Sequence, residues 1–358
     1  MIEASAPGKL FIVGEYAVVV PGEPAVLIAV DRLVTVRLSE IDGERGSVRS
    51  DRYGFAPKTW THAAGGGIVA DAEPLDYVLA AIEMIERLRA HRGGSPRCFD
   101  LDITSELDDP SGRKFGLGSS GAVTVAVIAV LDELYGLGLS RWDRFRLALL
   151  ATITVAPRAS GGDVAASTYR GWIRYAAPDR DRLAADLAAH GVAGALDSPG
   201  WDGCSVEPLP TPAATRVLVG WTGSPAATDL LVEQTRGPVR ADAAARAAFL
   251  AASRVIVEDL VAALAGEGAA PEVIRRSRRL LLTLSAASGT IIETPLLTAL
   301  CDAAELHGAA GKPSGAGGGD CGIVLAPAGF DAEPILQDWR SAGVLPLDVG
   351  VQQPEGAS

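Results

Sequence analysis

The chain runs Lys114-Phe115-Gly116-Leu117-Gly118-Ser119-Ser120-Gly121 directly before an apolar stretch, Ala122 to Leu131. This order predicts a glycine loop that opens a buried helix. The first turn of a helix has unpaired backbone N–H groups at the positive end of its dipole, and glycines let an anion approach the backbone closely. The stretch therefore predicts a phosphate-binding loop, in which two serine hydroxyls cap the helix, contact phosphate or help to bind magnesium.

The glycine loop also fits other interpretations. Gly116 to Gly121 match G-x-G-x-x-G, the dinucleotide fingerprint of nicotinamide-dependent dehydrogenases. That fingerprint follows an apolar strand and precedes an acidic residue by about 20 positions; here a polar turn, Asp108 to Lys114, comes before it and no suitable acid follows. A Walker A loop is absent as well, because Gly308 to Pro313 has the wrong spacing. A glycine turn with a serine cap stays open as a purely structural alternative.

Lysine is rare in this chain. Its 32 basic residues include four lysines, Lys9, Lys58, Lys114 and Lys312, and all but Lys58 stand in or beside glycine-rich stretches. An ammonium is a compact charge that can reach a phosphate oxygen. We therefore expect three of them to line a basic cleft and Lys58 to be solvated surface charge, with chance placement as the alternative.

Two later motifs add an acid and a second glycine cluster. Ser160-Gly161-Gly162-Asp163 places a carboxylate after a flexible turn, so Asp163 is the best candidate for a catalytic acid, although an Asp that caps the next helix has the same pattern. Ser314 to Gly319 can surround an anion with backbone donors, or form a tight turn before the strand Gly322–Leu325.

Composition limits the class of protein. The 358 residues are 48% apolar and 21% charged, as in a globular protein of one large or two ordinary domains. The longest apolar run is too short to cross a bilayer, and neither a secretory signal nor a targeting segment is recognisable, so we expect a cytoplasmic protein. A net charge of −12 disfavours nucleic acid and anionic membranes as partners. The scattered cysteines and histidines predict no disulfide framework and no zinc site.

Hydrophobic periodicity predicts the elements around these motifs. The expected strands are Leu10–Val13, Tyr16–Val20, Ala25–Val30, Leu33–Leu38, Cys98–Thr104, Gly171–Tyr175, Arg216–Trp221, Gly322–Leu325 and Val344–Val349. The expected helices are one from Pro74 to Gly93-Gly94, then Ala122–Tyr135 and Arg141–Thr154, roughly 226–236, 242–265, 271–287 and 295–307, and finally Glu333–Ala342. Proline and glycine between Ser198 and Pro212 indicate a boundary, which we place between residues 1–205 and 206–358.

The combination resembles the GHMP kinase superfamily, whose members share a Pro-Gly-Lys opening, a Gly-Leu-Gly-Ser-Ser loop and a late glycine cluster. Within it, the chain is most similar to the bacterial phosphomevalonate kinase branch, through Gly8–Ala17, Lys114–Gly121, Leu218–Thr222 and Lys312–Gly322. The resemblance implies an α+β fold with an N-terminal half like ribosomal S5 domain 2 and a ferredoxin-like C-terminal half. It implies ATP-dependent phosphorylation of 5-phosphomevalonate to 5-diphosphomevalonate, a step of isoprenoid biosynthesis.

The same resemblance implies roles for particular residues. Lys9 and Asp163 would stand at the transferring phosphoryl group, and Ser120 would bind Mg²⁺. The ATP phosphates would be held by Lys114, Gly116, Leu117, Gly118, Ser119, Ser120 and Gly121. The acceptor would be contacted by Lys9, Tyr16, Lys312, Ser314 and Gly315.

Two departures affect these expectations. Mevalonate kinases in the superfamily carry a magnesium-binding glutamate about a dozen residues before the aspartate, whereas Leu149 to Ile153 contains no acid. The loop ends in Gly121 where many members have alanine, which fits the phosphomevalonate branch better. The alternatives are another small-molecule GHMP kinase, for mevalonate or a sugar, and a ligand sensor on the same fold without catalysis. The predicted oligomeric state is a monomer or a homodimer.

Overall fold

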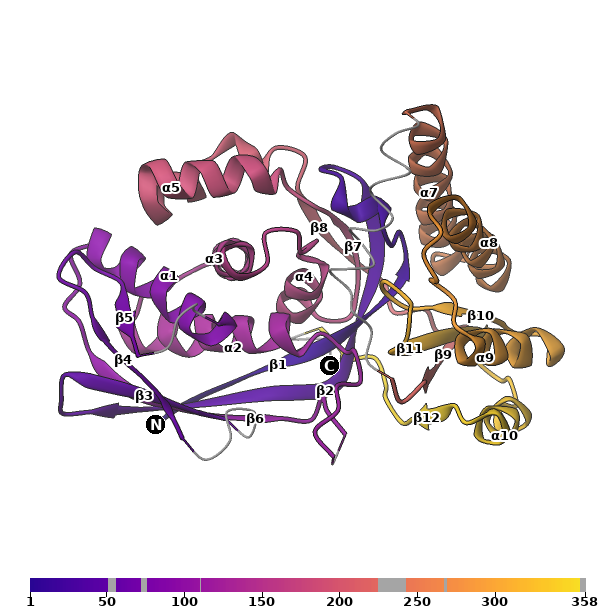
Figure 1. The fold of residues 1–358 in the computed structure, drawn as a ribbon, viewed down its shortest axis with the longest axis horizontal. Coiled ribbons are helices and arrows are strands. Elements are labelled where there is room, and N and C mark those ends of the chain that lie inside the picture. The colour runs from indigo at the N-terminus through magenta and orange to yellow at the C-terminus, as the bar shows by residue number, and fades with distance from the viewer. Residues whose placement is uncertain (51–55, 72–75, 110, 225–242, 267–268, 355–358) are drawn as a thin grey trace.

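The computed structural model describes residues 1–358 except 51–55, 72–75, 110, 225–242, 267–268 and 355–358, which are drawn in grey in Figure 1. Within the described residues the chain forms two β-sheets, each packed against helices, so the α+β class is confirmed (Figure 1). In that part of the chain every helix is too short or too polar to span a bilayer.

The first sheet contains the N-terminal strand and the chain segments up to about residue 209. Its strand order is β5-β4-β3-β6-β2-β7-β8, with β1 paired to β2. The strands are β1 (Ile2–Val13), β2 (Pro24–Ile41), β3 (Arg45–Ser50), β4 (Lys58–His62), β5 (Ile68–Ala70), β6 (Cys98–Ser105), β7 (Trp172–Ala176) and β8 (Ser205–Leu209). The antiparallel β1–β2 pair brings Lys9 opposite Ala29.

Helices cover one face of this sheet (Figure 1). They are α1 (Tyr77–His91), α2 (Ser119–Tyr135), α3 (Arg141–Val155), α4 (Gly162–Tyr169) and α5 (Arg180–Leu196), and a 3₁₀ turn, η2 (Pro199–Trp201), follows them. The apolar faces of these helices and of β1 and β2 form one continuous core. The predicted helices after Gly118 and Arg141 are confirmed, and so is the helix that Gly93-Gly94 ends, although its predicted start at Pro74 lies outside the described residues.

The turn between β1 and β2 differs from the prediction of a strand over Tyr16–Val20. Ala17–Val19 form a 3₁₀ helix, η1, because Gly14 and Tyr16 both have positive φ and turn the chain sharply. A side chain at Gly14 would collide with the backbone of Ala25 on β2. The tight turn thus requires glycine, and it directs Tyr16 toward the second sheet.

The second sheet has the strand order β10-β11-β9-β12. Its elements are β9 (Thr215–Trp221), α7 (Ala243–Leu264), α8 (Ala270–Ser288), α9 (Pro295–Leu306), β10 (Ala310–Pro313), β11 (Cys321–Pro327), α10 (Glu333–Ala342) and β12 (Leu345–Leu347). The strands and helices predicted here are confirmed apart from the helix over about 226–236, which lies outside the described residues. The short strand β10, which carries Lys312, was not predicted.

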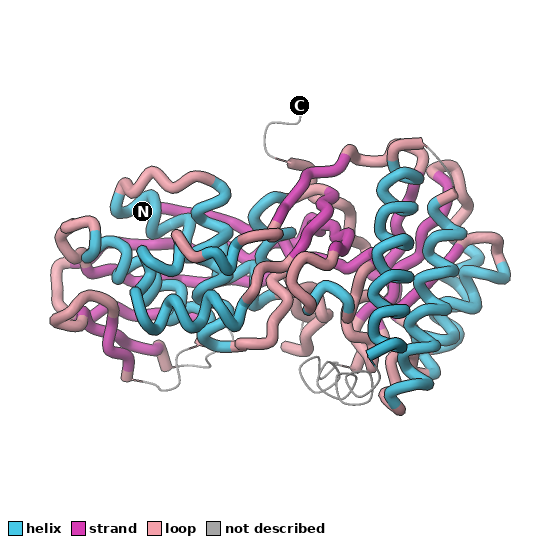
Figure 2. Tube along the Cα trace, turned by 90° about the horizontal axis from the view of Figure 1, so that it is seen from above, coloured by secondary structure: helices cyan, strands magenta, loops and turns pink. Residues whose placement is uncertain are grey.

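The end of the chain returns to the first sheet. Gln352 donates from its backbone N–H to Ala29 and accepts from the N–H of Gly171, at N···O distances of 3.0 and 2.8 Å. β8, which begins at Ser205, pairs with β7 in the first sheet, and β9 opens the second. The division at residue 205 stays a prediction, and the two halves lie side by side along the long axis (Figure 2).

Candidate active site

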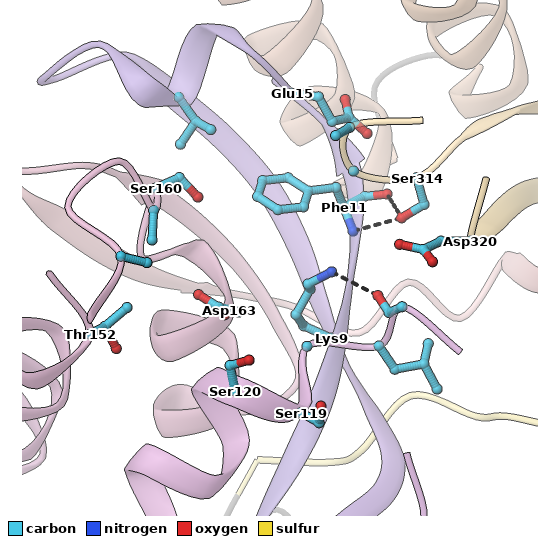
Figure 3. Close-up of a pocket in the computed structure, with 18 of the residues that line it drawn as sticks. Lys9, Phe11, Glu15, Ser119, Ser120, Thr152, Ser160, Asp163, Ser314 and Asp320 are labelled. Atoms are coloured by element: carbon cyan, nitrogen blue, oxygen red, sulfur yellow. Dashed lines mark hydrogen bonds between the residues drawn. The ribbon is translucent and has the colours of Figure 1, made fainter. Parts of the chain in front are cut away.

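A cavity of about 520 Å³ lies where the two halves meet. Chain segments that are far apart in the sequence line it: β1 with its turn, the start of α1, the glycine loop, the end of α3 with the loop that leads to α4, and the residues around Ser314. Figure 3 shows most of them. Most of the predicted site residues are there. The lining includes Lys9, Tyr16, Lys114, Gly116, Leu117, Gly118, Ser119, Ser120, Asp163, Ser314 and Gly315.

The glycine loop presents the open end of α2 to this cavity. Gly118 is the N-cap residue, in the left-handed conformation, and it offers no side chain to cap the helix. Ser119 and Ser120 lie inside the first turn, so the alternative of a serine-capped structural turn is wrong. The first N–H groups of the helix therefore face the cavity with the positive end of the dipole, as anion binding requires.

Gly116→Ala is expected to raise the nucleotide dissociation constant at least about tenfold, equivalent to about 1.4 kcal/mol. Gly116 has φ +83°, and a side chain there would overlap Asp320, which closes the loop from the second half. Gly112 is a matched control, because it has φ +82° but a Cβ at that position would meet no described atom within 4 Å. Titration of both variants with a non-hydrolysable ATP analogue checks the prediction; equal weakening in both would show that backbone strain alone matters.

Lys9 and Asp163 both lie close to Gly118. The backbone N–H of Lys9 donates to Leu117 O at 2.7 Å, and its ammonium donates to Gly116 O at 3.1 Å (Figure 3). A Cβ at Gly118 would lie 3.0 Å from Lys9 Cε and 3.3 Å from Asp163 Cβ. Burial raises the pKa of the Asp163 carboxyl, while the nearby charge of Lys9 opposes that shift. A cation and a carboxylate thus adjoin the anion-binding loop.

Asp163 is not the cap of its helix. Gly161 is the N-cap of α4 and Asp163 lies in the first turn, where its Oδ1 accepts from Val164 N at 3.0 Å. The aspartate follows Gly162, where a side chain would meet the ring of Phe11, and it packs against Gly121. Gly121 therefore lies behind Asp163 rather than among the residues that line the cavity.

Besides Lys9, the predicted acceptor contacts Tyr16, Ser314 and Gly315 line the cavity. Ser314 lies on the opposite side of it from Ser119 and Ser120 of α2 (Figure 3). Ser314 Oγ accepts from Phe11 N and donates to Phe11 O, both at 2.9 Å, which ties the second half to β1 (Figure 3). The Tyr16 hydroxyl donates to Ala316 O, and burial raises the pKa of Tyr16 well above its usual value. Both side chains thus hold the two halves together at the cavity wall.

Lys312 is not placed as predicted. Instead of facing a cleft, its side chain is fully buried, its ammonium is paired with Glu15, and it donates to Pro313 O at 2.6 Å. The expected basic cleft therefore contains Lys9 and Lys114 but not Lys312. The reason is the unpredicted strand β10, which orients this lysine toward the turn after β1.

A second cavity, of about 330 Å³, adjoins the first and shares Tyr77, Lys114, Ser119 and Ser120 with it. Its other walls are largely apolar. They include Val34, Val78, Ile103 and Val123, together with Lys58 and Asp76, whose charged groups lie 2.6 Å apart. Lys58 is therefore not the solvated surface charge that the sequence predicted. Nothing in the sequence marks these residues, because apolar positions on strands and helices look like core.

Further lining residues were not singled out from the sequence. The polar and charged ones among them include Glu15, Thr152, Arg158, Ser160 and Asp320. Thr152 stands within the segment where no acid was found, and its hydroxyl donates to Ala148 O at 2.8 Å. Ser160 and Asp320 stand within the glycine-rich stretches Ser160–Asp163 and Lys312–Gly322, so their glycine neighbours are the signal that could have indicated them.

Comparisons with known proteins agree with this geometry. Residues 76–171 match the family described as GHMP kinases N terminal domain, and residues 261–345 match GHMP kinases C terminal. A phosphomevalonate kinase from Streptomyces sp. (strain CL190) is 46% identical over 357 residues, which cover 96% of this chain and 95% of that protein. A mevalonate kinase from Methanothermobacter thermautotrophicus is 35% identical but over only 48% of each chain.

A solved structure is similar over the whole length as well. It is the Streptococcus pneumoniae phosphomevalonate kinase in complex with phosphomevalonate and AMPPNP, with a TM-score of 0.84, 29% identity, and coverage of 98% of this chain and 100% of that one. Both halves, the glycine loop and the full-length likeness point to the same group of enzymes. This chain belongs to the phosphomevalonate kinase family of the GHMP kinases.

Proposed function

We propose that the protein transfers the γ-phosphoryl group of ATP to the phosphate of (R)-5-phosphomevalonate, giving ADP and (R)-5-diphosphomevalonate. The observation that carries this proposal is the similarity to a phosphomevalonate kinase over 96% of the chain, against 48% for the mevalonate kinase. The cavity supports it, because an anion-binding helix end and two lysines suit two anionic substrates. In a protein of net charge −12, lysines that lie together in one cavity indicate that the cavity binds anions.

The nucleotide is assigned to the side of the cavity that the glycine loop forms. Gly116 to Ser120 and Lys114 would hold its phosphates, and the adjoining apolar cavity is wide enough for a base and ribose. The acceptor is assigned to the other end, beside Tyr16, Ser314 and Gly315. Lys9 and Asp163 lie between the two ends, where the phosphoryl group would pass.

Mg²⁺ is proposed as the partner of ATP. Among the described residues, no three His, Cys, Asp or Glu side chains gather into a ready metal site. Ser120 and Asp163 both line the cavity and offer oxygen ligands, and Mg²⁺ typically takes few protein ligands and fills its shell with phosphate oxygens and water. The residues present therefore fit the ion, which when bound would neutralise phosphate charge.

The chemistry demands little from a general base. A phosphate monoester has its second pKa near 6, so the attacking oxygen is already largely deprotonated at neutral pH. The chain's own work is to orient the two anions and to stabilise the charge on the transferring group, and Lys9 is placed for this. Asp163 would hold Lys9 in position rather than remove a proton from the acceptor.

An acceptor panel tests the function. We expect ADP release with phosphomevalonate to exceed that with mevalonate, galactose or homoserine by a factor of at least about 10³ in kcat/KM, because the site provides for a second phosphate. A coupled ADP assay at saturating ATP makes the measurement. Preference for mevalonate or a sugar would assign the chain to another kinase activity. Absence of turnover with every acceptor would favour the alternative of a ligand sensor without catalysis.

Two expectations remain predictions. They are the oligomeric state, a monomer or a homodimer, and the cytoplasmic location. Both are open to direct measurement, by sedimentation and by fractionation of cells. Small-molecule substrates are what the cavity fits.

A further inference from the structure

One wall of the cavity is formed by two short segments of the chain. The loop between α3 and α4 contributes Arg158, Ala159 and Ser160, and the 3₁₀ turn η1 contributes Val18 and Val19. The loop leads directly into Asp163, three residues after Ser160. Any displacement of this loop would therefore move both the wall and the aspartate.

Two buried side chains hold this wall from behind. Arg180 donates through Nη1 to Arg158 O at 3.1 Å and to Ala159 O at 2.6 Å, and through Nη2 to Val19 O. Tyr175 donates its hydroxyl to Ser160 O at 2.7 Å. Three successive carbonyls of the loop and one of η1 are thus bound by two side chains that do not themselves line the cavity.

Arg180 stands at an electrostatically unfavourable position of its own helix. It is the first residue of α5, where a cation opposes the helix dipole, and Asp179 already caps that helix by accepting from Arg182 N at 3.1 Å. Only 7% of Arg180 and none of Tyr175 is exposed. A buried guanidinium with fixed donor directions can join several carbonyls in one plane, which an ammonium cannot do.

The loop is shaped for close approach to these side chains. Gly161 has φ +78°, and a Cβ there would lie 2.8 Å from the Tyr175 hydroxyl oxygen. Ser160 Oγ accepts from Gly162 N at 3.3 Å, so the serine side chain is turned along the loop. The hydrogen bonds from Arg180 and Tyr175 thus determine where the loop backbone lies.

We propose that Arg180 and Tyr175 are positioning residues for the phosphoryl acceptor: they fix the Arg158–Ser160 wall and, through η1, the approach to Tyr16. This proposal rests on the proposed function. The nucleotide end of the cavity is built from α2 and the glycine loop, whereas the four carbonyls that Arg180 and Tyr175 bind belong to the α3–α4 loop and to η1. Loss of these hydrogen bonds should therefore weaken binding of the acceptor and leave binding of ATP unchanged.

The test compares Arg180→Met, Arg180→Lys and Tyr175→Phe with wild type, using the full chain. For Arg180→Met we expect KM for phosphomevalonate to rise at least about tenfold while KM for ATP stays within about twofold. Guanidinium chloride, at concentrations far below those that denature, should lower the raised acceptor KM of Arg180→Met and should not affect wild type. Arg180→Lys should be intermediate, because it keeps the charge but not the planar donors.

Arg89→Met is the matched control. Arg89 is also buried, with 5% exposure, and also binds backbone, donating to Gly94 O and to Glu86, but it lies on α1 and lines neither cavity. It should lower the melting temperature without raising KM for the acceptor. The control separates the effect of removing any buried arginine from the effect of removing the hydrogen bonds that Arg180 makes to the cavity wall.

The outcomes are distinguishable. Wild type is assayed first, and lack of turnover with phosphomevalonate would defeat the proposed function itself. With an active wild type, an unchanged acceptor KM in Arg180→Met, or equal rises for ATP and acceptor, would overturn the positioning role. If Arg180→Met does not fold, Tyr175→Phe decides, since it removes one hydroxyl: a selective rise in acceptor KM supports the proposal and no rise defeats it.

Discussion

Lys9→Met is expected to lower kcat at saturating ATP by about 10²- to 10³-fold, and by more than Asp163→Asn does. The ammonium of Lys9 adjoins the glycine loop through Gly116 O and faces the space between the two substrate ends. It is placed to stabilise charge that spreads over the transferring phosphoryl oxygens, and methionine keeps most of the length of the side chain but not the charge. A positioned charge raises kcat when it interacts more strongly with the transition state than with the bound substrates.

Asp163→Asn should be the milder change because the acceptor phosphate needs no strong base. Asparagine retains the shape and an oxygen for Lys9 or a metal-bound water, and it relieves the cost of ionising a buried carboxyl, whose pKa is raised by burial. Initial rates with both substrates saturating give the two kcat values. A larger loss in Asp163→Asn than in Lys9→Met would refute the assignment of roles.

Arg37→Met serves as the control for removal of a cation from the β1–β2 pair. Arg37 is paired with Glu3 at 2.6 Å, is 43% exposed in its side chain, and lies far along the hairpin from Lys9. We expect it to retain nearly full activity. A comparable loss of activity in this variant would mean that removal of any cation from the β1–β2 pair lowers kcat, wherever that cation lies.

Lys312→Met is expected to reduce the free energy of unfolding by about 3–5 kcal/mol, the usual effect of removing one partner of a buried ion pair. The side chains of Lys312 and Glu15 are 0% and 2% exposed. Without the lysine, the Glu15 carboxylate would remain buried, and its Oε2 already has no hydrogen-bond partner among the described residues. The substitution therefore creates an uncompensated charge where the two halves meet.

The double variant Glu15→Gln with Lys312→Met should recover part of this loss, since it removes the unpaired charge. Urea denaturation of the single and double variants measures the effect. Arg340→Met is the control: its pair with Glu333 is exposed, 53% and 66%, and such pairs contribute at most about 1 kcal/mol. A Lys312→Met variant as stable as Arg340→Met would show that the buried pair does not stabilise the fold.

Prediction from sequence succeeded where the residues of one short stretch are enough to determine its secondary structure. The glycine loop with its helix, and the strand and helix that carry Cys98 and Arg141, follow from local periodicity and turn residues, and the structure confirms them. The expectation that Lys9 and Asp163 lie together came from the resemblance to the GHMP kinases. The structure brings both residues into one cavity, while their roles stay a proposal.

Prediction failed where a distant partner decides the outcome. Lys312 was expected in a cleft because its neighbours are glycines, but its carboxylate partner is 297 residues away in the sequence. Tyr16 was expected in a strand, and the collision that forces the turn at Gly14 involves Ala25 of the next strand. Arg180 donates to backbone carbonyls, which every residue type has. No pattern of side chains in the sequence could therefore have indicated the role of Arg180.

The return of the C-terminal segment to β2 has a consequence for anyone who dissects this protein. Because Gln352 lies between Ala29 and Gly171, and Asp31 N donates to Gly350 O at 3.0 Å, a fragment that stops after β8 would leave these backbone groups of the first sheet unsatisfied. An autonomous N-terminal fragment would have to include residues 349–354, joined through a linker to the end of β8. Purification tags should accordingly be fused at Met1 rather than close behind Gln352.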